Sequence, residues 1–178
     1  MSLPSREEAL GLLERAGCSP HVVDHCLNVA KLALEMAGRL RARDLEVDVE
    51  LVEAGALLHD IGRGRVHDAS HSAVGGRMIR ELGLPEELAR IVDRHIGAGI
   101  PKAEARKLGL PKGVYTPETL EEKLVAYADK LVCGCRVVDI SVTIDDFASK
   151  LGAGHPAIRR LRDLHEEMSG LLGDVKQF

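Results

Sequence analysis

The sequence contains no tryptophan, and all aromatic residues together make up 2% of its 178 residues. So few aromatic rings argue against a platform on which single-stranded bases could stack. The formal net charge of −4 provides no strong basic field, which also argues against a nucleic-acid partner. No apolar run approaches the roughly 18 residues of a membrane-spanning helix, and the first residues lack the pattern of a signal peptide. We therefore predict a cytoplasmic protein with no membrane partner.

Cysteines and side-chain amides are also scarce. The four cysteines have neither the spacing of a disulfide framework nor that of a zinc finger, which favours a reducing compartment. The stretch Cys133-Gly134-Cys135 is too short for a usual zinc knuckle, so we expect its cysteines to pack against other residues. Asparagine and glutamine occur once each whereas 29% of the residues are charged, a composition that leans towards a thermophilic source.

The abundant apolar residues recur at helical spacing, between residues that start and stop helices. Ser5 with Glu8 has the pattern of a capping box, and Ser19-Pro20 marks the start of a second helix. Helix starts are predicted at Ser5, Ser19, Asp48, His71, Pro85, Thr116-Pro117, Thr143 and His155. We expect no strand, because no stretch alternates convincingly between apolar and polar residues. The pattern predicts an all-α fold, a compact single-domain helical bundle.

Three longer segments carry more specific predictions. The helix that opens at Thr116-Pro117 is expected to run through Val138, and the helix that Asp48 caps is expected to continue to Ile61-Gly62. The Gly/Pro-rich stretch 97–116 is expected to be irregular. Long irregular insertions in compact domains are often lids or substrate loops, and we expect that role here.

A few histidines and aspartates are the candidate site residues. His25 on the second helix and His95 at the end of an apolar stripe are, taken alone, more often surface or hydrogen-bonded core residues than metal ligands. His59-Asp60 closes an apolar helix, where the histidine could instead interact with the helix dipole. Asp129 has apolar neighbours on both sides, and desolvating an isolated carboxylate costs several kcal/mol. A metal ion would supply the partner that Asp129 needs.

Taken in order along the chain, these residues resemble a known pattern. His25, "HDIG" at 59–62 and Asp129 in "YADKL" resemble the HD superfamily of metal-dependent phosphohydrolases. That resemblance implies one HD phosphohydrolase domain over residues 1–178, with the metal-site core in about 18–140 and further helices in 141–178.

Two more histidine motifs extend the resemblance. "HSAVGG" at 71–76 and "DRHIGAG" at 93–99 are similar to motifs of dinuclear HD enzymes, such as the symmetrically cutting dinucleoside tetraphosphate hydrolases and the cyclic dinucleotide phosphodiesterases. The chain departs from the cyclic dinucleotide enzymes, because Ile96 follows a lone His95 and their glycine–tyrosine–proline signature is absent. One or two divalent metal ions are implied, with Mn, Fe, Ni, Zn and Mg all open.

The resemblance also assigns roles. It implies that His25, His59, Asp60 and Asp129 bind the first metal, and that Asp60 bridges to a second metal held by His71 and His95. The predicted catalytic residues are Asp60, Arg63 and Lys130. Arg63 follows the ligands directly and Lys130 matches the family's "DK" ending, so we expect both to meet phosphate. His67 is interpreted as a loop histidine, with proton donation to the leaving group as the alternative, and His165 as a helix-surface residue.

This set of residues permits phosphoester hydrolysis. A divalent metal lowers the pKa of bound water towards about 7, and two metals about 4 Å apart can hold the attacking and the leaving oxygen. The sequence contains neither a G-x-S-x-G nucleophile motif nor a Walker phosphate-binding loop, so neither suggests a different reaction. We predict a metal-dependent phosphohydrolase that cleaves a phosphomonoester or phosphoanhydride of a nucleotide-like small molecule, with a dinuclear site favoured. A mononuclear nucleotide phosphatase, a non-catalytic nucleotide-binding regulatory module and a homo-oligomer all stay open.

Overall fold

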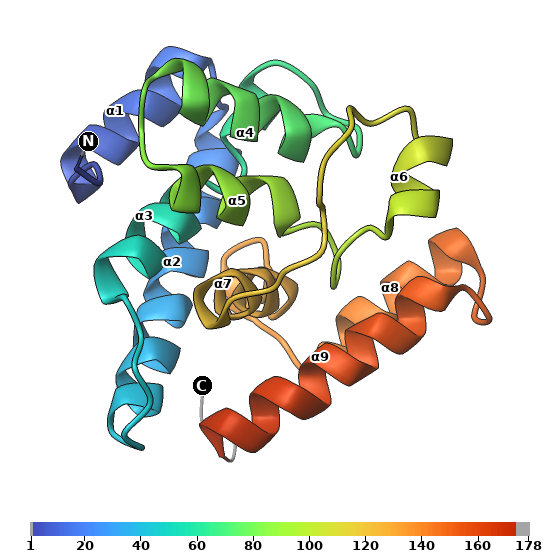
Figure 1. Ribbon diagram of the computed structural model, residues 1–178. Coiled ribbons are helices and arrows are strands. Elements are labelled where there is room, and N and C mark those ends of the chain that lie inside the picture. Colours follow the sequence, from blue (N-terminus) through green and yellow to red (C-terminus); the bar gives the residue numbers. More distant parts are fainter. Residues whose placement is uncertain (1, 174–178) are drawn as a thin grey trace.

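The computed structural model describes residues 2–173, whereas Met1 and residues 174–178, which end the predicted C-terminal segment 141–178, lie outside the described residues. Within residues 2–173 the chain forms nine α-helices, one 3₁₀ turn (η1) and a hairpin of two short strands (Figure 1). The all-α prediction is therefore confirmed, whereas the expectation of no strand is wrong at this short hairpin. No helix of this described part is long and apolar enough to cross a membrane. The elements are α1 (Arg6–Ala16), α2 (Pro20–Arg41), α3 (Val49–Leu58), η1 (Ile61–Gly64), α4 (His71–Glu81), α5 (Glu86–Arg94), α6 (Lys102–Lys107), α7 (Leu120–Lys130), β1 (Val132–Cys133), β2 (Arg136–Val137), α8 (Ile140–Leu151) and α9 (Pro156–Leu172).

The first helix starts follow from local chemistry, as predicted. At α1 the Ser5 hydroxyl accepts a hydrogen bond from the Glu8 N–H, while the Glu8 carboxylate accepts one from the Ser5 N–H. At α2 the Ser19 hydroxyl accepts from the Val22 N–H, and Pro20 occupies the first helical position. These caps satisfy backbone donors that a helix start leaves unpaired, so a few neighbouring residues suffice to set the boundary.

Helix α7 is shorter than predicted at both ends. It begins after the capping box of Thr119 and Glu122, not at Thr116-Pro117. Beyond its end the chain turns through Gly134, which has φ +60°, and β1 pairs with β2. The predicted continuation to Val138 is therefore wrong: the helix ends at Lys130, and the left-handed conformation of Gly134 forms the turn of the hairpin that follows.

Three other segments also correct the sequence interpretation. Cys133 and Cys135 are exposed at the hairpin, so the expectation that they pack against other residues is wrong. The stretch 97–116 is not wholly irregular, because α6 lies within it. Helix α3 stops at Leu58, which leaves His59-Asp60 in the break before η1 rather than inside a helix.

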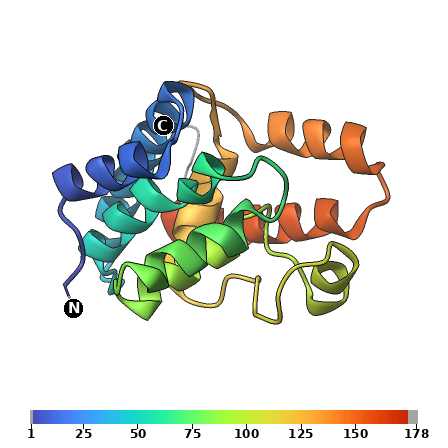
Figure 2. The ribbon, with the colours of Figure 1, turned by 90° about the horizontal axis from the view of Figure 1, so that it is seen from above.

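Helix α7 runs through the centre of the molecule. Figure 1 shows it nearly end-on, and α2, α3, α5 and α9 pack against it. The core between these helices consists mainly of leucine, valine, isoleucine and alanine side chains, with Tyr127 as the largest fully buried one. Helices α8 and α9 pair as a hairpin that projects from this body (Figure 2). The arrangement brings the C-terminal end of α7 close to α2 and α3, which carry the first candidate ligands.

Candidate metal centre

The structure brings all six predicted metal ligands together. The donors come from α2, the break after α3, the first residue of α4, the residue after α5 and the last turn of α7. They are His25, His59, Asp60, His71, His95 and Asp129, the first and last being 104 positions apart. All but His25 are buried, with at most 9% of each residue exposed. The site therefore depends on the packing of five separate segments.

Two groups of donors can be distinguished by distance. The ligand atoms of His25, His59 and Asp129 lie within 4.8 Å of one another. His25 Nε2 is 2.9 Å from Asp129 Oδ1, and His59 Nε2 is 3.5 Å from the same oxygen. A second group, His59, Asp60 and His95, also lies within 4.8 Å. His59 therefore belongs to both groups.

Asp60 stands between the two groups. Its Oδ2 lies 3.7 Å from His59 Nε2, whereas its Oδ1 lies 3.0 Å from His71 Nε2 and 3.5 Å from His95 Nε2. The two imidazoles also face each other, with 3.1 Å between His71 Nε2 and His95 Nε2. The two carboxylate oxygens of Asp60 thus point towards different histidines.

Backbone carbonyls orient three of the imidazoles. The Nδ1 of His59, His71 and His95 lies 2.8, 2.7 and 2.8 Å from the carbonyl oxygen three residues earlier in each case. A carbonyl can only accept, so each Nδ1 carries the hydrogen and each Nε2 presents a lone pair. Protein ligands of metals are commonly oriented in this way. The Asp68 carbonyl, from the second His-Asp pair of the sequence, is the acceptor for His71.

The donors fit a divalent metal ion. Among residues 2–173, His59 Nε2 and Asp60 Oδ1 are buried atoms with no hydrogen-bond partner, and leaving such groups unsatisfied costs about 1–3 kcal/mol each. The Nε2 lone pairs of His71 and His95 also point at each other, which is unfavourable unless a cation lies between them. Imidazole nitrogens with carboxylate oxygens suit Zn, Mn, Fe or Ni better than Ca.

The pKa directions of His95, Asp60 and Asp129 agree with this fit. His59 differs: burial lowers its pKa, but nearby Cys26, Asp60 and Asp129 outweigh burial and hold the pKa well above the ordinary value, so a metal ion must compete with a proton for its Nε2. Burial lowers the pKa of His95 to about 4, which keeps its imidazole neutral. Burial raises the pKa of Asp60 and of Asp129, but nearby cations and donors outweigh it and hold both pKa values well below the ordinary range. For Asp60 the opposing groups are mainly histidines, and for Asp129 the first is Lys130. Both carboxylates therefore remain ionised, as metal ligands must be.

The predicted phosphate-binding residues lie beside the carboxylates. Arg63 Nε donates to Asp60 Oδ2 at 2.7 Å, and its Nη1 is 3.5 Å from the His67 carbonyl. Lys130 Nζ pairs with Asp129 Oδ2. The side chain of Arg63 is 31% exposed and that of Lys130 only 13%, so Arg63 reaches further towards solvent. Their contact with phosphate stays a prediction.

Gly62 explains how Asp60 and His71 come so close. A Cβ at position 62 would lie 2.0 Å from the His71 carbonyl oxygen and 2.8 Å from the Gly75 nitrogen. Only a residue without a side chain lets η1 pack on the first turn of α4 at this distance. The glycine of the "HDIG" stretch is therefore a packing requirement of the site.

Sequence reasoning missed a buried ion pair next to the site. Arg94 Nη1 donates to both carboxylate oxygens of Glu122, at 3.0 and 2.9 Å, and to Glu118 at 2.7 Å. The pair joins the end of α5, where His95 follows, to the first turn of α7. The available signal was an arginine directly before a candidate ligand at the end of an apolar stripe.

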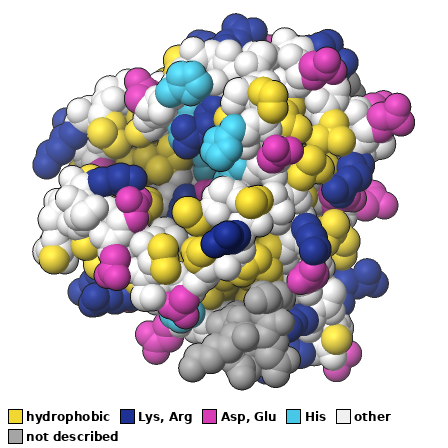
Figure 3. All heavy atoms as spheres, turned by 180° about the vertical axis from the view of Figure 1, so that it is seen from behind, with side chains coloured by type: hydrophobic (Ala, Val, Ile, Leu, Met, Phe, Trp, Pro, Cys, Tyr) yellow, Lys and Arg dark blue, Asp and Glu magenta, His cyan; other side chains and the backbone are white. Residues whose placement is uncertain are grey.

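The remaining histidines lie outside the cluster. His67 is exposed, and His155 caps α9 as predicted, its side chain accepting from the Ala157 N–H. His165 is half-buried and lies 2.7 Å from the Tyr127 hydroxyl, so its interpretation as a surface residue is wrong. On the face shown in Figure 3, histidine side chains gather at a hollow beside a basic side chain.

The family model of the HD domain matches residues 22–132, which include all six clustered donors. The chain belongs to the HD-domain family. The sequence resemblance to HD metal-dependent phosphohydrolases is thereby confirmed. The HD domain of the phosphodiesterase PgpH of L. monocytogenes, solved in complex with cyclic-di-AMP, has the same fold. It aligns with a TM-score of 0.54 and 21% identity over 94% of this chain and 100% of that one.

Sequence relatives of this HD-domain protein fall into several kinds. An uncharacterized protein of Methanocaldococcus jannaschii is 51% identical over 166 residues, which cover 93% of this chain and 98% of the relative. The tRNA (cytidine(56)-2'-O)-methyltransferase of Picrophilus torridus is 38% identical over 96% of this chain, which spans only 48% of that relative. Ribonuclease Y of Fusobacterium nucleatum is 36% identical over 52% of this chain and 18% of its own length.

Proposed function

We propose that this chain is a metal-dependent phosphohydrolase that cleaves a phosphomonoester or phosphoanhydride of a nucleotide-like small molecule. One observation carries the proposal. Six nitrogen and oxygen donors from five segments converge, and two of them, His59 Nε2 and Asp60 Oδ1, are buried without a partner in the described chain. Membership of the HD-domain family supports a hydrolase activity. We also propose that residues 1–178 form one HD domain, because α1 packs on α3 and α9 packs on α7.

The proposed ligand assignment follows the resemblance to dinuclear HD enzymes. It differs from the two distance groups, because His59 is assigned to the first ion only, His71 joins the second and Asp60 is shared. His25, His59, Asp60 and Asp129 would hold the first ion, and Asp60, His71 and His95 the second. Asp60 is proposed as the bridge, because its Oδ2 faces His59 while its Oδ1 faces His71 and His95. A divalent metal at this site supplies activated water and neutralises charge on the phosphoryl oxygens.

The chain's own residues prepare the site for that chemistry. Arg63 and Lys130 each hold one ligand carboxylate in place and ionised. The carbonyl oxygens behind His59, His71 and His95 keep the Nε2 lone pairs directed at the centre. Because Arg63 is partly exposed, we propose that its outer guanidinium nitrogens also bind a phosphoryl oxygen of the substrate.

The names of similar proteins support the substrate class only broadly. The PgpH domain was solved with a cyclic dinucleotide, and two kinds of relatives are named for action on RNA. A substrate panel should therefore contain nucleoside mono-, di- and triphosphates, linear and cyclic dinucleotides, and a short oligoribonucleotide. Release of product is to be measured with Mn, Fe, Ni, Zn and Mg in separate reactions.

Metal content and turnover together test the proposal. We expect Asp60→Asn and Asp129→Asn to lose metal, by elemental analysis after anaerobic purification, and to lose phosphate release. Asp163→Asn is the matched control, because Asp163 is an exposed carboxylate on α9. If both site variants retain metal and activity, the proposal is wrong. Nucleotide binding without product release under any metal would instead identify a regulatory module.

The number of ions is tested separately. His71→Ala removes a proposed ligand of the second ion and leaves all four proposed ligands of the first ion in place. A dinuclear site predicts that metal content falls from about two ions per chain to about one, with a large loss of activity. A mononuclear site predicts one ion per chain before and after the substitution.

A further inference from the structure

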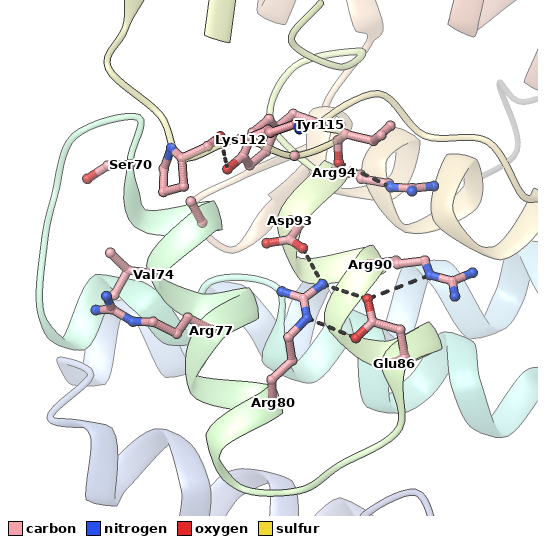
Figure 4. A pocket seen from close by; sticks show the side chains of 14 residues that line it. Ser70, Val74, Arg77, Arg80, Glu86, Arg90, Asp93, Arg94, Lys112 and Tyr115 are labelled. Atoms are coloured by element: carbon pink, nitrogen blue, oxygen red, sulfur yellow. Dashed lines mark hydrogen bonds and ion pairs between the residues drawn. The ribbon is translucent and has the colours of Figure 1, made fainter. Parts of the chain in front are cut away.

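A cavity of about 600 Å³ lies between α4, α5 and residues 111–115 (Figure 4). Successive side chains of a helix rotate by about 100°. Arg80, nine residues after His71, therefore points to the opposite side of α4, and Glu86, nine residues before His95, does the same on α5. None of the six proposed metal ligands lines the cavity, which is therefore separate from the metal centre, and part of the predicted substrate loop forms its third wall.

The lining of this cavity is basic. Five arginine and lysine side chains line it together with only two acidic ones, in a chain of formal net charge −4. Two of the arginines have strong internal partners. Arg80 donates to Glu86 at 2.8 and 2.7 Å and to Asp93 at 2.7 Å, and Arg94 donates to Glu122. These pairs, of which the first is drawn in Figure 4, fix one side of the cavity.

The other three cations are weakly paired and come from three different walls. Arg77 Nε lies 3.6 Å from Glu81, and Arg90 Nε lies 3.8 Å from Glu86. Such exposed contacts contribute little, and their geometry leaves the guanidinium donors largely uncommitted. Lys112 has no ion-pair partner within residues 2–173. Three available cations around one cavity match a ligand with several anionic oxygens.

The same cavity also has an apolar part, formed by Ala73, Val74, Pro111, Val114 and Tyr115. Sites for small molecules have volumes of about 300–1,000 Å³ and combine apolar walls with a few polar groups. A bare phosphate needs no apolar wall, whereas a nucleotide carries both kinds of surface. We propose that this cavity binds a phosphate-bearing organic molecule of nucleotide size, at a second site distinct from the metal centre.

The second site adjoins two segments that carry proposed metal ligands. Ser70 and Arg94 line the cavity, and each directly precedes a proposed metal ligand, His71 or His95. A molecule bound here touches the segments that place both histidines. The second site therefore adjoins the segments that carry two of the proposed ligands without containing a ligand itself.

Calorimetric titration of the full chain with α,β-methylene-ADP, whose two phosphorus atoms are joined by a bridge that cannot be hydrolysed, tests the binding. We expect binding to the metal-loaded protein and also after EDTA treatment. Arg77→Ala and Lys112→Ala should each weaken it about tenfold, the effect of losing one charge-assisted hydrogen bond. Methylenediphosphonate, which lacks the nucleoside, should bind more weakly.

Arg159→Ala is the matched control. Arg159 is an exposed helical arginine with an aspartate four residues on at 3.8 Å, much as Arg77 has Glu81 at 3.6 Å. The Arg159→Ala variant should bind α,β-methylene-ADP with the affinity of the wild type. The proposal is overturned by absence of binding, by binding that EDTA abolishes, or by binding that Arg77→Ala and Lys112→Ala leave unchanged. Equal affinity for methylenediphosphonate would overturn the nucleoside part. None of these outcomes depends on turnover, so failure of the proposed hydrolase would be seen separately.

Discussion

Substitution of Gly62 by alanine tests whether packing behind the metal centre places its donors. The added Cβ would lie 2.0 Å from the His71 carbonyl oxygen and 2.8 Å from the Gly75 nitrogen. Both contacts are with backbone atoms, so no change of rotamer can relieve them. Because non-bonded heavy atoms pack at roughly 3.5 Å, η1 and α4 must separate by on the order of 1 Å.

The expected cost follows from this overlap. Inserting a methyl group into a packed interior usually costs about 1–3 kcal/mol. The higher helical propensity of alanine offsets at most about 1 kcal/mol of this. We therefore expect Gly62→Ala to lower the free energy of unfolding by about 2 kcal/mol. Metal content should fall as well, because Asp60 Oδ1 and His71 Nε2, now 3.0 Å apart, sit on the two segments that must separate.

Urea unfolding and elemental analysis measure the two effects. Gly38→Ala is the control, because a Cβ at position 38, inside α2, would meet no atom within 4 Å. That variant should gain about 0.5–1 kcal/mol from the better helix former and keep its metal. If Gly62→Ala unfolds at the wild-type urea concentration with full metal content, the contact between η1 and α4 does not position the donors, and the argument fails.

Three further predictions use other parts of the structure. Glu122→Gln should lower the free energy of unfolding by about 2 kcal/mol in urea titration, because Arg94 stays buried and keeps only the exposed Glu118 as a charged partner; an unchanged midpoint would contradict this. EDTA should lower the melting temperature, and excess metal should restore it. A free metal concentration of one hundred times the Kd adds about 2.7 kcal/mol to the free energy of unfolding. A melting temperature that does not change with EDTA would count against the metal centre. Burial raises the pKa of Cys18 to about 11, so at pH 8 only about one in a thousand molecules carries its thiolate. Mass spectrometry should then show iodoacetamide labelling Cys133 and Cys135 well before Cys18, and equal rates would refute the shift.

Helix starts and the order of the donors could be predicted from the sequence, because both depend on short-range chemistry. The Ser5–Glu8 capping box involves four neighbouring residues, and the same box appears in the structure. The gathering of His25 and Asp129 was inferred from a family resemblance. No local rule brings together residues that are 104 positions apart.

The errors arose where distant contacts or glycine conformation decide the structure. Val132 and Val137 look like a continuing helix, but Gly134 turns the chain so that the two residues pair across a hairpin. His165 looks exposed in a helical pattern, but packing of α9 on α7 places it against the Tyr127 hydroxyl. The basic cavity was missed for the same reason, because its cations lie on three segments and each alone is typical of a solvated surface.

Arg63 and Lys130 connect the structural and the chemical parts of the proposed mechanism. Two ionised carboxylates buried among imidazoles would repel each other and favour protonation unless positive charge lies close to them. The Oδ1 of each carboxylate is directed at histidines, while its Oδ2 is paired with Arg63 or Lys130; Asp60 Oδ2 also faces His59 at 3.7 Å. These cations therefore keep the oxygens available for metal binding at neutral pH. Arg63 holds Asp60 through Nε alone, so its terminal nitrogens extend beyond the carboxylate on the partly exposed side. One side chain can thus orient a ligand and bind the substrate's phosphoryl oxygen, a combination for which the planar guanidinium is better suited than an ammonium group.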